Sequence, residues 1–337
     1  MSKEEPVIRV LITGAASPRA YALAGLVANG MALGSKQPMI FHLFDVPNET
    51  GKMEGLMMEL IDSAFPLLRE VITTCDPVVA FQDISVAFLL DAKTRPFDMT
   101  QRDLIVFNAK TFKDHGLCLE NFARKDCKVI VLAYPGNTMC YICAEHAPSI
   151  PRENFTANTR LNHNRTIGHL AYKYKMPPVN FRNVIVWGNQ SQSMYTDCSI
   201  ASVVIGNKSN RIFEYMPDEI AYLKTQLAEQ IANRGTDIIA ARKLPSGLSA
   251  AKAACDQLRD WIVGTPHGTI VSMTVSSDGS YGTPKELFFS LPVEITRGKW
   301  SIVRGIKLDE LARNKIDANT KELLQEKMQA ITELGDT

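Results

Sequence analysis

The sequence has little of what is typical of a nucleic-acid-binding or membrane protein. Its 337 residues include 37 basic and 36 acidic side chains, so the formal net charge is only +1 and favours neither nucleic acid nor an anionic membrane. No apolar run approaches the roughly 18 residues of a membrane span. The first residues, MSKEEPVIRV, have neither a hydrophobic signal core nor an amphipathic transit pattern. We therefore expect a cytoplasmic protein whose partners are small molecules or proteins.

The cysteines do not form a disulfide or metal-binding pattern. There are seven of them, an odd number without framework spacing, which favours reduced thiols. Cys140 and Cys143 form a C-x-x-C pair, but the pair lies in an apolar helical stretch without a second pair nearby. Zinc needs four ligands, whereas burial alone explains isolated cysteines. We expect no metal site.

The first half of the chain alternates strand patterns with helical ones. Its apolar or β-branched runs are VIRVLIT, MIFHLFDV, VAFLL and KVIVLAY, and helical stretches separate them. This alternation predicts βαβ units with right-handed crossovers and a parallel sheet. The fold class is therefore α/β, with a Rossmann-like, doubly wound parallel sheet domain over residues 1–150.

The second half has a different pattern after the turn-like APSIPREN. Long helical patterns cover residues 218–241 and 246–263, and a charged helix begins at Asp309. The strand-like runs TIVSMTV and ELFFSLPVEI lie between them. These features predict a mixed α+β domain over residues 151–337, and the 45% hydrophobic content is enough to give both domains a core.

One turn in the first domain is a candidate dinucleotide site. Gly14 lies between a strand and a helix, where a pyrophosphate can accept hydrogen bonds from the helix N–H groups. Asp45 ends the second strand, which suits the hydroxyl pair of a ribose. A single glycine is a weak signal, and an ordinary strand-to-helix turn explains the same pattern.

Several longer motifs resemble one enzyme family. They are VLITGAA, MELIDSAFPLL, APSIPRENF, TRLNHNR, NVIVWGN, ARKLPSGLSAAKAACDQLRDWIVGTP and SSDGSYGTPKELFFSLPV. Over residues 7–334 the chain resembles the malate/lactate dehydrogenase family, in particular its cytosolic-type malate dehydrogenases. The resemblance implies an NAD-binding Rossmann domain, a mixed catalytic domain and a homodimer.

The chain departs from this family around the cofactor. The family usually has glycine or small residues in the phosphate loop, where this chain has Ser17, Pro18 and Arg19. Pro18 has no N–H to offer a phosphate, although the charge of Arg19 partly compensates. Asp91 replaces a glycine, and its carboxylate is expected to repel a pyrophosphate. We expect weak or lost NAD binding, with cofactor contacts at Gly14, Ser17, Arg19, Asp45, Asn108 and His115, of which the last two equally fit ordinary polar surface.

The three catalytic positions that the resemblance implies are all substituted. In the family, a histidine held by an aspartate transfers the proton and a loop arginine polarises the carbonyl. By alignment these positions are Gln190, Asn162 and Gln101. Glutamine has no titratable proton near neutral pH, and asparagine cannot stabilise an imidazolium as a carboxylate does.

The positions that hold the substrate in the family are less altered than the catalytic positions. The resemblance assigns the two carboxylates of the substrate to Arg95 and Arg160, and a further contact to Asn137. Guanidinium groups bind carboxylates bidentately, so a small dicarboxylate remains a predicted ligand. The alternative is that Arg95 is a solvated loop charge and that Arg160 pairs with a carboxylate of the protein.

These features together predict a pseudoenzyme, a family member that is inactive or strongly impaired. It would keep the fold and the homodimer and have a binding or structural role, with a protein partner that the sequence does not identify. The first alternative is an active NAD-dependent malate or 2-hydroxyacid dehydrogenase with altered catalytic groups. The second is an enzyme of another reaction type that uses the same clamp.

Overall fold

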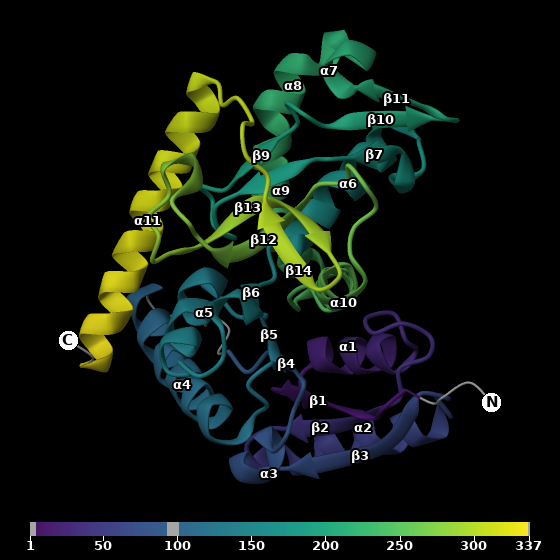
Figure 1. Ribbon diagram of the computed structural model, residues 1–337, viewed down its shortest axis with the longest axis vertical. Coiled ribbons are helices and arrows are strands. Elements are labelled where there is room, and N and C mark those ends of the chain that lie inside the picture. Colours follow the sequence, from purple (N-terminus) through teal and green to yellow (C-terminus); the bar gives the residue numbers. More distant parts are fainter. Residues whose placement is uncertain (1–4, 93–100, 336–337) are drawn as a thin grey trace. The chain divides into compact units, whose positions relative to one another are not determined.

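A computed structural model describes residues 5–92 and 101–335, and Figure 1 shows its helices and strands. The chain forms two compact units. Unit 1 comprises Met1–Asn158, Gly247–Arg259 and Gln325–Thr337, and unit 2 comprises Thr159–Ser246 and Asp260–Leu324. Because two later segments return to unit 1, the units are not consecutive along the chain.

Unit 1 is built on a six-stranded parallel sheet with the order β3-β2-β1-β4-β5-β6. The order reverses between β1 and β4, so the carboxyl ends of these strands form a topological switch point. The predicted doubly wound, Rossmann-like sheet is confirmed. The strands are β1 (Ile8–Thr13), β2 (Met39–Phe44), β3 (Leu68–Thr74), β4 (Val86–Leu89), β5 (Lys128–Val131) and β6 (Phe155–Ala157).

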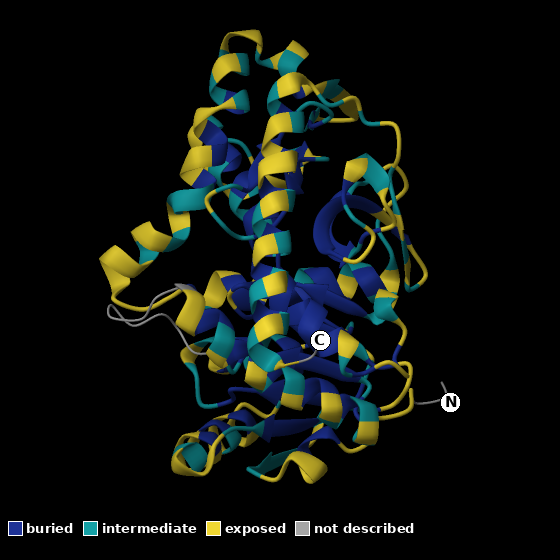
Figure 2. Cartoon of the chain, turned by 90° about the vertical axis from the view of Figure 1, so that its left-hand side faces the viewer, coloured by how far each residue is buried: buried dark blue, intermediate teal, exposed yellow. Residues whose placement is uncertain are grey.

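Five helices connect these strands. Val10, Leu11, Ile12 and Phe88 on the central strands are completely or almost completely buried, as expected for strands that helices cover on both faces. Figure 2 shows these strands in the dark blue of buried residues. The helices are α1 (Pro18–Ala28), α2 (Thr50–Asp62), α3 (Pro77–Phe81), α4 (Gln101–Phe122) and α5 (Gly136–Glu145).

Unit 2 combines helices with short antiparallel strands, which confirms the predicted mixed class. One sheet has the order β11-β10-β7, a second has the order β12-β13-β14, and β8 pairs with β9. Leu170, Phe181, Val186, Leu223 and Leu227 belong to a buried cluster beneath the first of these sheets. The strands are β7 (Phe181–Arg182), β8 (Ile185–Trp187), β9 (Tyr195–Asp197), β10 (Ser202–Ile205), β11 (Lys208–Arg211), β12 (Val271–Ser276), β13 (Phe288–Thr296) and β14 (Lys299–Ile302).

Two long helices, α10 and α11, contribute residues to both units. Short 3-10 turns link several of the other elements. The remaining helices are α6 (Arg160–Tyr174), α7 (Ile212–Tyr215), α8 (Ile220–Lys224), α9 (Gln226–Arg242), α10 (Leu248–Val263) and α11 (Glu310–Leu334), and the turns are η1 (Pro47–Glu49), η2 (Arg152–Asn154), η3 (Pro178–Asn180), η4 (Pro217–Glu219) and η5 (Ser280–Gly282).

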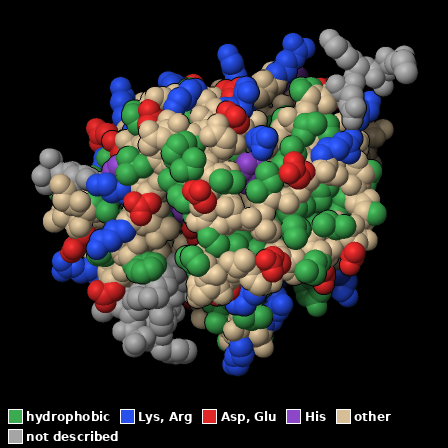
Figure 3. All heavy atoms as spheres, turned by 90° about the horizontal axis from the view of Figure 1, so that it is seen from below, with side chains coloured by type: hydrophobic (Ala, Val, Ile, Leu, Met, Phe, Trp, Pro, Cys, Tyr) green, Lys and Arg blue, Asp and Glu red, His purple; other side chains and the backbone are tan. Residues whose placement is uncertain are grey.

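The surface and the cysteines carry no special chemistry in the described part of the chain. None of the described helices has the length and apolar character that a membrane span needs. Basic and acidic side chains are interspersed on the face that Figure 3 shows. All seven cysteines are free thiols, and burial raises the pKa of Cys118 to about 11. Residues 5–92 and 101–335 contain no cluster of side chains that could hold a metal ion.

Candidate functional site

Gly14 brings the ends of β1 and β4 close together. Its φ angle is +60°, and a Cβ at this position would lie 2.9 Å from the backbone of Asp91. Only glycine fits, because an L side chain is strained at this φ and would collide with the neighbouring backbone. The close approach of the two strand ends at the switch point therefore requires a glycine at this position.

The start of α1 satisfies part of its own backbone. The Ser17 hydroxyl accepts a hydrogen bond from the Ala20 N–H at 3.2 Å, and Pro18 occupies the first helical position. Both features are typical of a helix N-terminus. Pro18 has no N–H, and the Ser17 hydroxyl already interacts with the Ala20 N–H. This turn therefore offers a phosphate fewer donors than a glycine-rich loop does.

Asp45 lies where a ribose site is expected, directly after β2. One carboxylate oxygen accepts from the Ala16 N–H at 2.9 Å, and the other accepts from the Val46 N–H at 2.8 Å. Each oxygen has further acceptor capacity. The carboxylate thus fixes the β1–α1 turn and can still accept a hydroxyl group of a ligand.

Asp91 and His115 interact with each other inside unit 1. His115 Nε2 lies 2.7 Å from both carboxylate oxygens of Asp91, and the Thr13 hydroxyl donates to Oδ1 at 2.6 Å. Burial by itself raises the pKa of Asp91, but the interactions with His115 and Thr13 outweigh it and the pKa is lowered. The ionised carboxylate therefore has a donor on each side.

This pairing gives Asp91 and His115 an internal role. The predicted repulsion of a pyrophosphate by Asp91 stays a prediction, and the carboxylate is directed to His115 and Thr13. The predicted cofactor contact of His115 also stays a prediction; only 5% of the residue is exposed, and its ring packs near Phe44, Phe81 and Phe112. Each side chain satisfies the other.

Asn108 also has an internal role. It is completely buried, and its Nδ2 donates to the Tyr134 carbonyl at 2.9 Å. It thereby holds the segment that follows β5. Arg19 is the remaining predicted cofactor contact, and its Nη1 donates to the Leu132 carbonyl at 2.5 Å instead of pointing into solvent.

Gln190 lies in a loop of unit 2 that is fastened to α11. Gly188 begins the loop with φ +97°, and Asn319 donates to the buried Asn189 side chain at 2.9 Å. The Ser191 hydroxyl donates to Glu322 at 2.9 Å. These bonds hold the half-buried Gln190 in a defined place.

Asn162 is buried in α6 and interacts with neutral and cationic partners. Its Nδ2 lies 2.9 Å from the sulfur of Met194, and its Oδ1 accepts from Arg165 at 3.0 Å. Only 2% of Asn162 is exposed. The Asn162 amide has no titratable proton, so it cannot act as a carboxylate would in this place.

Arg160 is paired with the protein itself. Its Nη1 lies 2.6 Å from Asp260 Oδ2, and its Nε donates to Asn164 at 3.0 Å. This is the alternative in which Arg160 pairs with a protein carboxylate. It leaves the guanidinium with less capacity for a ligand carboxylate.

The other predicted positions give less information. Arg95 lies outside the described residues, and Gln101 is the first residue of α4 and its side chain is likewise outside them. Asn137 is in the first turn of α5 and is 2% exposed.

Arg165 is a functional candidate that the sequence analysis missed. It donates to Asn162 and, at 2.9 Å, to the Ser246 hydroxyl, and its buried Nε has no hydrogen-bond partner among the described residues. Burial, and then the nearby Arg234, lower its pKa to about 10, so it stays charged at neutral pH. The spacing of three residues from Asn162 on one helix face was the available signal.

A half-buried cation in this position favours an anionic partner. Among the described residues, no carboxylate forms an ion pair with Arg165. Buried charges in proteins are normally paired, because burial without a counter-charge is costly. Arg165 is therefore the best candidate in unit 2 for holding a ligand carboxylate.

Neighbouring titratable groups do not replace the missing acid and base. His163 is buried at 3.2 Å from the Ser272 hydroxyl, and burial followed by the charge of Arg160 lowers its pKa well below the ordinary value. His169 lies 2.7 Å from the Tyr222 hydroxyl. Burial raises the pKa of Tyr195, so its phenol stays protonated at neutral pH and is not available as a base.

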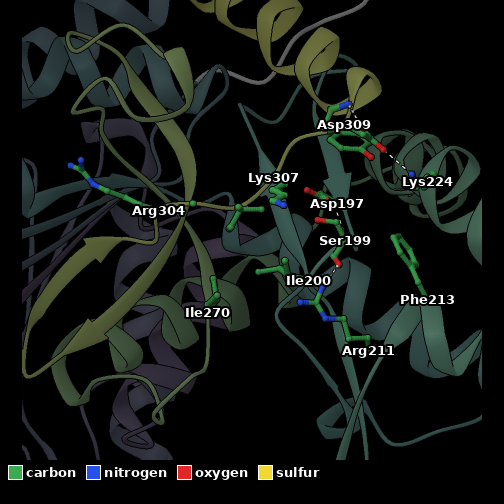
Figure 4. A pocket seen from close by; sticks show the side chains of 14 residues that line it. Asp197, Ser199, Ile200, Arg211, Phe213, Lys224, Ile270, Arg304, Lys307 and Asp309 are labelled. Atoms are coloured by element: carbon green, nitrogen blue, oxygen red, sulfur yellow. Dashed lines mark hydrogen bonds and ion pairs between the residues drawn. The ribbon is translucent and has the colours of Figure 1, made fainter.

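A pocket of about 700 Å³ in unit 2 lies apart from these positions (Figure 4). Lys224 and Asp309 form an ion pair of 2.7 Å at its edge, and Asp197 and Lys307 lie near its centre. None of the predicted site residues lines it. The carboxylate of Asp197 accepts hydrogen bonds from the Trp187 indole and the Ser199 N–H, so its oxygens already have partners within the protein.

Comparison with known proteins adds independent information. The family model "lactate/malate dehydrogenase, NAD binding domain" matches residues 8–156, and the model of the family's α/β C-terminal domain matches residues 159–334. The chain is 44% identical to malate dehydrogenase 1, cytoplasmic, of Arabidopsis thaliana, over 96% of this chain and 97% of that protein. It is 43% identical to the cytoplasmic malate dehydrogenase of Homo sapiens, again over 96% and 97%.

Solved structures give the same result. A malate dehydrogenase from Naegleria fowleri superposes with a TM-score of 0.91 and 33% identity, over 98% of this chain and 100% of that chain. A lactate dehydrogenase from Trichomonas vaginalis, solved with NADH and oxamate, superposes with a TM-score of 0.92 and 32% identity, over 98% and 100%.

Proposed function

Since this chain belongs to the lactate/malate dehydrogenase family, we propose that it is a member that has kept a ligand-binding fold and lost hydride-transfer catalysis. The observation that carries the proposal is the environment of Asn162. Its amide lies between Met194 and Arg165, where the family uses a carboxylate to hold a catalytic imidazole. Gln190, at the position of that imidazole, has no proton to exchange near neutral pH.

The expected loss is large. General acid–base catalysis contributes about 10²–10⁴-fold to a reaction rate. The effects of groups that act together are not additive, so the loss of a histidine and its carboxylate counts as the loss of one unit. No other described side chain near these positions has a pKa and an exposure that suit the task.

We further propose that unit 2 still binds a small carboxylate through Arg165. The role that the sequence analysis gave to Arg160 passes to Arg165, because Arg160 already pairs with Asp260. The sequence relatives described above are malate dehydrogenases, so a dicarboxylate such as malate or oxaloacetate is the ligand to test first. Asn137 is proposed as a second contact.

NAD binding is proposed to be weaker than in active relatives. When bound, NAD would supply the hydride acceptor. In this chain, Asp45 suits a ribose and the turn at Gly14 suits a close approach of the backbone. Ser17, Pro18 and Arg19 do not suit the phosphates and the second half of the cofactor as well. The cofactor therefore fits one half of the crevice better than the other.

The remaining proposals follow from the relatives. They are named cytoplasmic, and we propose the same location and a homodimer for this chain. Sedimentation of the purified protein at micromolar concentration tests the dimer, since a single species with the mass of one chain would contradict it.

The proposed function is tested by following NADH absorbance with oxaloacetate and a panel of 2-oxoacids at neutral pH. We expect no oxidation above that in buffer, while an active cytoplasmic malate dehydrogenase measured in parallel verifies the assay. Turnover within tenfold of the roughly 10 s⁻¹ of a typical enzyme would instead support an active dehydrogenase with altered catalytic groups.

A further inference from the structure

The side chain of Arg19 crosses the carboxyl edge of the sheet in unit 1. Arg19 is at the second position of α1, which follows β1, and its Nη1 donates to the carbonyl of Leu132, which directly follows β5. Strand β4 lies between β1 and β5 in the sheet. The Leu132 N–H in turn donates to the Leu89 carbonyl at the end of β4. The guanidinium therefore spans the ends of three adjacent strands.

This span lies across one particular part of a dinucleotide crevice. In a sheet with this strand order, the two mononucleotide-binding halves lie on opposite sides of the switch point. The half made by β1, β2 and β3 contains the acidic residue for a ribose, here Asp45. The half made by β4, β5 and β6 receives the other mononucleotide. Arg19 leaves the first half open and crosses the second.

The bond that holds Arg19 is a strong one. A guanidinium that donates to a carbonyl makes a charge-assisted hydrogen bond. Burial lowers the pKa of Arg19, and its Nε is buried without a partner among the described residues. Arg19 is half-buried and held by this bond, so a ligand that enters the second half must displace its side chain.

We propose that unit 1 binds a nucleoside 5′-phosphate in its first half and excludes the nicotinamide half of NAD, with Arg19 as the residue that determines this specificity. Asp45 binds the ribose hydroxyls, while the Arg19 guanidinium stays on the Leu132 carbonyl and occupies the second half. This inference concerns which nucleotide binds, whereas the proposed function concerns the loss of hydride transfer. Either one can hold without the other.

The test is calorimetric titration of the full chain with ADP and with NADH. The wild type is expected to bind ADP, and to bind NADH no more than about threefold more tightly. Arg19→Ala and Arg19→Met should each raise the preference for NADH over ADP by about tenfold or more. The methionine variant keeps most of the aliphatic bulk and removes only the donor. Asp45→Asn should weaken both ligands.

Arg69→Ala is the matched control. Its guanidinium also donates to a backbone carbonyl, that of Pro66 at 2.6 Å, but it lies on β3 away from the switch point. The preference for NADH over ADP should not change in this variant. A wild-type preference for NADH of tenfold or more, or an unchanged preference in both Arg19 variants, would overturn the inference. Undetectable ADP binding at millimolar concentration would overturn it as well.

Saturation-transfer NMR on the wild type gives a result that does not depend on any variant. With NADH as the probe, saturation should reach the adenine and adjacent ribose protons and largely spare the nicotinamide protons. Equal saturation of both ends would overturn the inference. The titrations and the NMR measurement involve no turnover, so they test only the nucleotide specificity. Measurable reduction of oxaloacetate would contradict the proposed function and not this inference.

Discussion

The imidazole of His115 lies 2.7 Å from both carboxylate oxygens of Asp91, and the pair joins α4 to the end of β4 inside unit 1. The carboxylate has its pKa lowered in the folded state. A lowered pKa stabilises the fold fully above the unfolded value of about 3.9 and loses that effect as the pH falls through the folded value.

The first prediction is that Asp91→Asn destabilises the protein at neutral pH. The loss should be about 3 kcal/mol or somewhat less, because the carboxylate is buried but not completely so. The difference in unfolding free energy between wild type and variant should shrink as the pH falls below about 4. Urea unfolding at pH 7 and at pH 3 measures both values.

A double-mutant cycle with His115→Gln separates the pair from other effects. The two single variants and the double variant should show a coupling free energy of about 1–3 kcal/mol. Additive losses would mean that the two side chains stabilise the fold independently, which the 2.7 Å contacts argue against.

The second prediction concerns repair of the chemistry. Gln101→Arg, Asn162→Asp and Gln190→His together should raise oxaloacetate reduction more than any single substitution, since the histidine and its carboxylate act as a unit. A carboxylate at position 162 would lie beside Arg165, which now donates to the asparagine at 3.0 Å. Asn162→Asp alone should therefore give no useful activity.

Gln192→His is a matched control for this repair. Gln192 lies in the same loop as Gln190 but is exposed, so a histidine there adds an imidazole without placing it at the family position. It should not substitute for Gln190→His in the triple variant. A triple variant that binds NADH but stays inactive would show that positions other than these three limit the reaction.

The parts of the fold with periodic sequence patterns were predictable. Strands such as VIRVLIT and KVIVLAY alternate with helices, and this local regularity determines the parallel sheet of unit 1. Gly14 was a weak signal in the sequence, and only the structure shows that its conformation and its contact with Asp91 admit no side chain.

The directions of polar side chains were not predictable in the same way. His115 and Asp91 are 24 residues apart, and only the packing of α4 against the sheet brings them together. Arg19 has a loop-like sequence context, and nothing local indicates that its guanidinium turns to Leu132. Arg160 and Arg165 lie in the same motif, and the sequence does not show that Asp260, 100 residues away, pairs with Arg160 and leaves Arg165 without a carboxylate.

The third prediction concerns the loop that carries Gln190. A Cβ at Gly188 would lie 2.2 Å from the Asn319 side chain, at a φ angle of +97°. Gly188→Ala should therefore destabilise unit 2 by about 2–4 kcal/mol, the range of severe steric and backbone effects. Gly206→Ala is the matched control, because its φ is +57° and no atom lies within 4 Å of the added Cβ.

Gly206→Ala should lose only about 1 kcal/mol, from backbone strain alone. Thermal unfolding of the two variants measures the difference between them. Similar losses would mean that backbone strain explains both and that Asn319 moves aside without cost.

The fourth prediction is that Arg165, and not Arg160, holds a ligand carboxylate. Oxaloacetate or malate should raise the melting temperature of the wild type, because a ligand that binds only the native state stabilises it, by about 2.7 kcal/mol at a concentration 100-fold above Kd. Added salt should weaken the shift. Arg165→Met should abolish it, since this removes a half-buried cation that has no carboxylate partner among the described residues. Arg160→Met should lower the melting temperature without ligand, because it leaves Asp260 unpaired, and should still show a shift with ligand.

If Arg160→Met abolishes the shift and Arg165→Met does not, the clamp lies where the sequence alone placed it. If millimolar dicarboxylate leaves even the wild type unchanged, the charge of Arg165 is tolerated for structural reasons and unit 2 is not a carboxylate-binding site.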